Sequence, residues 1–136
     1  MLATALLCCT GCGRDTTEPR NVPVLIVNPA RDTIPGTHKV RIDYVVDNRS
    51  ELPVTVVTCE GFTMVTVERR TGGGWQPDAY YGCPQAPYTD VVVAPHDSHP
   101  GAFAVGIAGT YRVKVWRRPN EQSSESFIIS PSFVVR

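Results

Sequence analysis

The clearest strand in the sequence is Gly109-Thr110-Tyr111-Arg112-Val113-Lys114-Val115-Trp116. Within it, Tyr111, Val113 and Val115 alternate with two basic residues and a tryptophan. Such alternation is typical of a β-strand that buries one face and exposes the other to water. The stretch therefore predicts a half-buried strand near the end of the chain.

Similar short β-branched runs, separated by Pro, Gly, Asn and Asp, continue from Val22 onward. We find no apolar 3.6-residue period long enough for a helix. The predicted strands are residues 22–27, 40–46, 54–59, 62–69, 90–94, 102–107, 111–116 and 126–135. A long aromatic, proline-containing loop is expected between residues 75 and 89. The pattern predicts an all-β domain.

Seven or eight short strands, together with the Gly-Thr-Tyr step at residues 109–111, resemble an immunoglobulin-like domain. In that fold, a tyrosine at the start of a late strand donates its hydroxyl to an upstream backbone group. The resemblance implies an antiparallel β-sandwich of seven to eight strands over residues 22–136, with Tyr111 at such a tyrosine corner.

The order of several motifs is also distantly similar to the BsuPI-type proteinase-inhibitor domain. The motifs are Asn48-Arg49-Ser50, Gly74-Trp75, Val93-Ala94-Pro95, Gly109-Thr110-Tyr111 and the C-terminal Ser130-Pro131-Ser132-Phe133. The Pro-Gly step expected at Pro95-His96 is displaced to Pro100-Gly101. A secreted, proteinase-inhibitor-like binding protein is therefore the alternative function.

The composition favours one small globular domain. The chain has 136 residues, 42% of them hydrophobic, and its 13 Lys and Arg balance 13 Asp and Glu. A protein that coats nucleic acid would be clearly basic. We therefore expect no nucleic-acid partner.

The N-terminal residues are typical of a targeting segment. Residues 1–11 carry no charge, and they are too few for a membrane-spanning helix, which needs about 20 apolar residues. Cys9-Thr10-Gly11-Cys12 resembles the lipobox of bacterial lipoproteins, in which small residues precede a lipidated cysteine. The resemblance implies a signal segment over 1–11, lipidation of Cys12 and a flexible tether over 12–21.

This resemblance implies a lipoprotein of the bacterial cell envelope, anchored in the membrane through its N-terminal lipid and facing the periplasm or the exterior. A frayed apolar N-terminus is the alternative explanation. A metal site at Cys8, Cys9 and Cys12 is another, although no further ligands stand nearby with suitable spacing.

Cys59 and Cys83 are the remaining cysteines. In an oxidising compartment two such thiols tend to pair. A bridge would close a loop of about 25 residues and add about 3 kcal/mol in the chain-entropy model. Two unpaired buried thiols are the alternative.

No motif predicts catalysis. His96-Asp97-Ser98-His99 places two imidazoles and a carboxylate on one segment, but a polar turn between strands explains it better than a metal site, since no fourth ligand is signalled. No Gly-x-Ser-x-Gly elbow and no phosphate-binding loop occurs. We predict no enzyme activity, no catalytic residue, no metal and no cofactor.

The candidate binding loop is residues 75–88, which hold Trp75, Tyr80, Tyr81 and Tyr88. Aromatic side chains offer a large, rigid contact area at low entropic cost, so a peptide or a carbohydrate is a suitable ligand. Alternatively, the rings close the end of the sandwich and cover the Cys59–Cys83 bridge.

A second candidate surface is the solvent-exposed face of the strand at 111–116. Its members are Arg112, Lys114, Trp116 and Arg118, joined by Arg69 and Arg70. Interleaved cations and aromatics suit an anionic glycan or a strand of nucleic acid. Arginine stems packed across Trp116 explain the pattern equally well.

Together these features predict a noncatalytic envelope lipoprotein. Its immunoglobulin-like domain acts as a binding module for an envelope protein or glycan, or as a structural module.

Overall fold

The computed structural model describes residues 22–28, 34, 36–83 and 87–136. All regular structure in this part of the chain is β, as predicted, and none of its residues forms a helix that could cross a membrane. The described residues form eleven strands rather than the expected seven or eight. They are β1 (Pro23–Asn28), β2 (Val40–Asn48), β3 (Val54–Cys59), β4 (Phe62–Thr63), β5 (Val65–Thr71), β6 (Gly74–Tyr81), β7 (Tyr88–Val93), β8 (Ser98–Val105), β9 (Gly109–Trp116), β10 (Phe127–Ile129) and β11 (Phe133–Val135).

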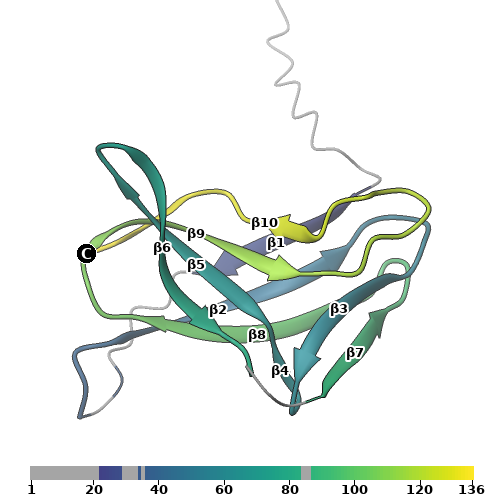
Figure 1. Cartoon of the computed structure of the whole chain (residues 1–136), viewed down its shortest axis with the longest axis horizontal. Coiled ribbons are helices and arrows are strands. Elements are labelled where there is room, and N and C mark those ends of the chain that lie inside the picture. Colours follow the sequence, from purple (N-terminus) through teal and green to yellow (C-terminus); the bar gives the residue numbers. More distant parts are fainter. Residues whose placement is uncertain (1–21, 29–33, 35, 84–86) are drawn as a thin grey trace, which may run out of the picture.

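The strands form an antiparallel β-sandwich. One sheet has the order β1-β2-β8, and the opposing sheet has the order β10-β9-β5-β6, with β11 also paired to β9. The small sheet β4-β3-β7 lies at the right in Figure 1, and an isolated bridge between Val56 and Arg117 connects it to the end of β9. The hairpin between β5 and β6 projects at the upper left.

The hydrophobic core lies between the two larger sheets. Tyr111, Val113 and Val115 of β9 are all fully buried, as their alternation predicts. They pack in one cluster with Ile42, Tyr44 and Val46 of β2, Phe103 and Val105 of β8, and Val65 and Val67 of β5. The period-two pattern therefore identified the buried face of β2, β5 and β9 correctly.

The extra strands have local causes. The predicted strand at 62–69 is interrupted at Met64, and the one at 126–135 is interrupted around Pro131. Residues 74–81, expected in a loop, form β6 instead. Pro77 lies in β6, and this is compatible with pairing because β6 is an edge strand, where a missing N–H is tolerated.

The β5–β6 pairing explains why an aromatic, proline-containing segment is extended. The hairpin turns at Thr71–Gly74, where Gly74 adopts a φ of 116°, a conformation that favours glycine. A register shift between Val67 and Glu68 accommodates one extra residue on β6.

The tyrosine corner is present. The hydroxyl of Tyr111 donates to the carbonyl of Ile107 at 2.6 Å, while its ring is fully buried. This is the upstream backbone contact that the Gly-Thr-Tyr step predicted.

Asn48 ties the end of β2 to two neighbouring segments. Its fully buried amide donates to the carbonyls of Leu52, Val93 and Ala94 at 2.9–3.1 Å. Its carbonyl oxygen accepts from the backbone N–H and the hydroxyl of Ser50, at 3.1 and 2.6 Å. A single side chain thus forms hydrogen bonds with polar groups of the turn after β2 and of the chain leaving β7.

Candidate binding groove at the edge of the sandwich

A groove of about 890 Å³ opens where the edge strands β6 and β8 face each other. Residues from the end of β6, from β4 and from the middle of β8 line it. The groove therefore lies at one open side of the sandwich, between the two main sheets.

Tyr81 spans the gap between these two strands. Its hydroxyl donates to the carbonyl of Ala104 and accepts from the N–H of Ala104 at 3.3 Å. Because Ala104 belongs to β8, this contact shows that the peptide groups of Ala104 face away from β2 and toward the groove.

The direction of the other β8 peptide groups follows from the antiparallel ladder. Peptide groups of alternate residues point to the same side of a strand, so Ala102 and Pro100 present theirs to the groove as Ala104 does. Pro100 lacks an N–H, which suits a position on a free edge. Within the described residues, β8 pairs with β2 alone, and Ala102 offers both a donor and an acceptor at the open edge.

Gly101 and Tyr44 form the floor of the groove. A Cβ atom on Gly101 would lie 2.2 Å from the ring of Tyr44, so only glycine fits above this ring. Burial raises the pKa of Tyr44 to about 12, although a hydrogen bond with the side chain of Thr63 partly opposes this. The floor is therefore a buried, uncharged phenol.

The walls are aromatic and unusually exposed. The side chain of Phe62 is 76% exposed and that of Tyr80 is 51% exposed. The Cys59–Cys83 disulfide, predicted as one of two alternatives, is formed, with a Cα–Cα distance of 5.9 Å. It joins the end of β3 to the residues after β6, and thereby holds these two walls together.

The polar groups near the groove are few. Arg41 and Asp43 form an exposed ion pair at 2.9 Å on its rim. His99, on β8, lies 3.1 Å from the hydroxyl of Thr63, and burial lowers the pKa of this imidazole. The groove is therefore suited to apolar side chains and backbone hydrogen bonds rather than to a highly charged ligand.

The predicted binding residues do not all meet. Tyr80 and Tyr81 line the groove, whereas Trp75 and Tyr88 do not. Trp75 lies at the far end of β6 beneath the guanidinium of Arg112, 4.6 Å from the ring centre. Tyr88 is paired with Cys59 at the start of β7. The pairing of β6 with β5 and of β7 with β3 separates residues that a loop could have brought together.

The tryptophan that packs near the disulfide is Trp116 rather than Trp75. It packs with Cys83 against the small cluster of Val57, Cys59 and Met64. Sequence reasoning also missed Phe62 and the free edge of β8. The displaced Pro100-Gly101 step was the available signal, since it marks an edge and a position without space for a side chain.

The histidines do not converge. His96 adopts a φ of 62° and contacts Glu51 at 3.3 Å, while His99 faces Thr63. In the part of the chain that the structure describes, no three His, Cys, Asp or Glu residues are grouped to hold a metal ion. The His-Asp-Ser-His segment thus forms a turn into β8.

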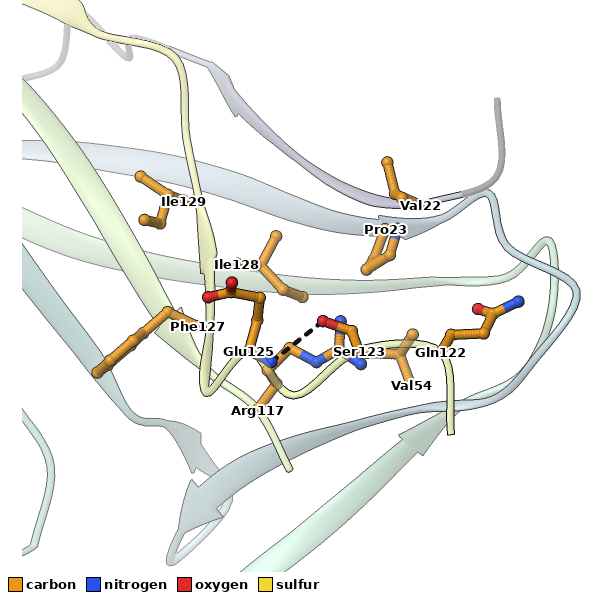
Figure 2. Close-up of a pocket in the computed structure, with 10 residues that line it drawn as sticks. All are labelled: Val22, Pro23, Val54, Arg117, Gln122, Ser123, Glu125, Phe127, Ile128 and Ile129. Atoms are coloured by element: carbon orange, nitrogen blue, oxygen red, sulfur yellow. Dashed lines mark hydrogen bonds between the residues drawn. The ribbon is translucent and has the colours of Figure 1, made fainter. Parts of the chain in front are cut away.

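A smaller pocket of about 380 Å³ lies beside β10 (Figure 2). Arg117, only 6% exposed, lines it, and burial lowers the pKa of this guanidinium while the charge of Glu125 opposes that change. The hydroxyl of Ser123 accepts from the N–H of Glu125 at 3.1 Å, the dashed line in Figure 2. This contact orders the loop before β10.

No known protein family matches the sequence, and no curated protein matches it either. Solved structures with partial similarity include β-glucosidases. A GH3 β-glucosidase of Bifidobacterium adolescentis is 15% identical over 83% of this chain and 17% of its own, with a TM-score of 0.41. A β-glucosidase of Listeria innocua, solved with glucose, is 13% identical over 82% of this chain and 16% of its own, with a TM-score of 0.33. The chain thus spans about a sixth of the length of these enzymes.

Proposed function

We propose that this protein is a noncatalytic lipoprotein of the bacterial envelope, and that its immunoglobulin-like domain is a binding module for an extended polypeptide. The observation that carries the binding proposal is the free edge of β8 beside an aromatic groove. Lipidation of Cys12 and the tether over 12–21 lie outside the described residues, and they rest on the lipobox resemblance.

An extended peptide fits the groove by strand addition. In this mode of recognition, main-chain hydrogen bonds to an open edge supply affinity, and pockets for alternate side chains supply specificity. Ala102 offers the donor and the acceptor, and the exposed rings of Phe62 and Tyr80 offer the apolar contact. Since the groove holds little charge, we expect apolar side chains in the ligand.

A pair of variants tests the backbone contact. Ala102→Pro removes an N–H that points away from β2, whereas Ala102→Gly keeps it. Peptides selected on the wild-type protein from a random phage-displayed library should bind Ala102→Gly normally and lose about tenfold in affinity to Ala102→Pro. Phe62→Ser, at a highly exposed position, should lower the affinity for the same peptides without affecting folding.

Equal binding to Ala102→Pro and Ala102→Gly would contradict strand addition. Failure to select any peptide, with the fold verified by circular dichroism, would contradict polypeptide binding altogether.

The anchor has a separate test. Expressed in a bacterium, the wild-type chain should gain a lipid-sized mass and enter the detergent phase, while Cys12→Ala should remain aqueous. If both remain aqueous with residues 1–12 attached, the envelope assignment is wrong.

The BsuPI-type resemblance supports a second candidate, a secreted binding protein that inhibits a proteinase. This candidate predicts unlipidated protein in the culture medium. It also predicts that the protein slows the cleavage of a fluorogenic substrate by a proteinase, whereas peptide binding in the phage selection does not imply inhibition.

A further inference from the structure

The outer face of the sheet β6-β5-β9-β10 carries a row of cations that the groove does not use. Lys114 lies opposite Thr66, Arg112 lies opposite Glu68, and Arg70 stands two residues beyond Glu68 on β5. The three cations therefore occupy successive two-residue levels, about 7 Å apart along the strands. We call Lys114, Arg112 and Arg70 the cationic row.

Only one acid lies within the row. Glu68 is buried, and Lys114 at 2.7 Å and Arg112 at 2.5 Å share its carboxylate. Burial alone would raise the pKa of Glu68, but hydrogen bonds from Lys114 and Arg112, together with their charges, lower it. Three cations against one carboxylate leave the row with a net positive charge.

Aromatic rings hold the cations in place. The guanidinium groups of Arg112 and Arg70 lie 4.6 and 5.9 Å from the centre of the Trp75 ring, and the ammonium of Lys114 lies 5.5 Å from that of Phe127. Such contacts stabilise a cation over a ring face and restrict its rotamers. A restricted cation loses less entropy when it binds an anion.

We propose that the cationic row binds the carboxylates of an acidic polysaccharide built from uronic acids. A linear polymer with a carboxylate on each sugar complements a straight row of separated positive charges. Guanidinium groups match carboxylates in a planar, two-bond geometry, which suits Arg112 and Arg70.

The same geometry disfavours nucleic acid. Single strands bind through bases stacked on free aromatic faces, but cations already lie over the rings of Trp75 and Phe127. This site does not depend on the peptide groove, so it can be tested separately.

The probe is a defined oligomer of galacturonic acid, titrated into the full chain and followed by tryptophan fluorescence and calorimetry. Neutral dextran oligomers and oligo-dT are the comparison ligands. We expect the galacturonate oligomer to bind and to weaken with added salt. The double variant Arg112→Gln/Lys114→Gln should lose about tenfold in affinity or more.

Two further variants separate binding from folding. Lys39→Gln removes an exposed lysine beside β2, on the opposite sheet and outside the groove, and should leave the affinity unchanged. Glu68→Gln removes the one acid and releases Arg112 and Lys114, so it should bind the galacturonate oligomer more tightly. A purely structural role for the row predicts no such gain.

The proposal is overturned if the galacturonate oligomer does not bind, if dextran or oligo-dT binds as tightly, or if Glu68→Gln weakens binding. Loss of peptide binding in the groove variants would not affect any of these outcomes.

Discussion

The hydroxyl of Tyr111 donates to the carbonyl of Ile107 at 2.6 Å, across the turn that leads into β9. The contact closes this turn against the core, because the ring of Tyr111 is fully buried and stacks on Phe133. Tyr111→Phe keeps the ring and removes one hydrogen bond. We expect the free energy of unfolding to fall by about 1 kcal/mol, measured by urea denaturation.

Phe133→Leu is the matched control for this prediction, since it disturbs the stacked ring and keeps the hydrogen bond. If Tyr111→Phe unfolds at the same urea concentration as the wild type, the tyrosine corner does not stabilise this domain.

Replacement of Asn48 should be one of the most damaging single changes in the molecule. Asn48→Ala would leave the carbonyls of Val93 and Ala94 without their side-chain donor and would remove the acceptor for Ser50. We expect a loss of about 3 kcal/mol in the free energy of unfolding, since the affected groups are largely buried. Ser50→Ala, which removes only the hydroxyl, should cost clearly less. Equal losses would mean that the amide is not the centre of this network.

Gly101→Ala should destabilise the domain for steric reasons. The new methyl group would lie 2.2 Å from the ring of Tyr44, which is itself held in the core. Overpacking of this kind costs about 1–3 kcal/mol. Adding Tyr44→Phe to Gly101→Ala should restore part of the lost stability, because the phenolic oxygen of Tyr44 is one of the atoms closest to the new methyl group. Thermal unfolding of the single and double variants would measure the change in stability. A Gly101→Ala variant as stable as the wild type would contradict the close packing of Gly101 on Tyr44.

The pH dependence of stability should include a contribution from His99. Burial lowers the pKa of His99 below its ordinary value of 6.5, so the unfolded chain binds a proton more readily than the folded one. The contribution of neutral His99 is therefore fully present above pH 6.5 and is lost as the pH falls below it. Urea denaturation between about pH 7.5 and pH 5 should show a smaller decline for His99→Gln than for the wild type. His96→Gln, at an exposed turn, is the control, and identical pH profiles for all three proteins would exclude the effect.

Local pattern was sufficient for much of the fold. The alternation in β2, β5 and β9 identified the buried faces, and the Gly-Thr-Tyr step identified the tyrosine corner, because both depend on residues close together in the chain. The Cys59–Cys83 pair was one of two open alternatives, since spacing alone cannot show whether two Cβ atoms meet.

The candidate site was only partly predictable. Tyr80 and Tyr81 were identified from the aromatic composition of their segment. Trp75 and Tyr88 lie elsewhere, because Trp75 is held in β6 by pairing with β5 and Tyr88 is held in β7 by pairing with β3. Phe62 and Ala102 carry no unusual local pattern. Their importance comes from exposure and from the edge position of β8, which are properties of the assembled sheets.

The sequence by itself determined the all-β class, the inward faces of the central strands and the tyrosine corner, because a period of two and a short turn are local properties of the chain. Only the tertiary structure decided which strands became edges, which aromatic residues line the groove, and that Lys114, Arg112 and Arg70 share one face with a single carboxylate. These relationships depend on register between strands distant in sequence, and such register is set by packing of the whole core rather than by any one segment.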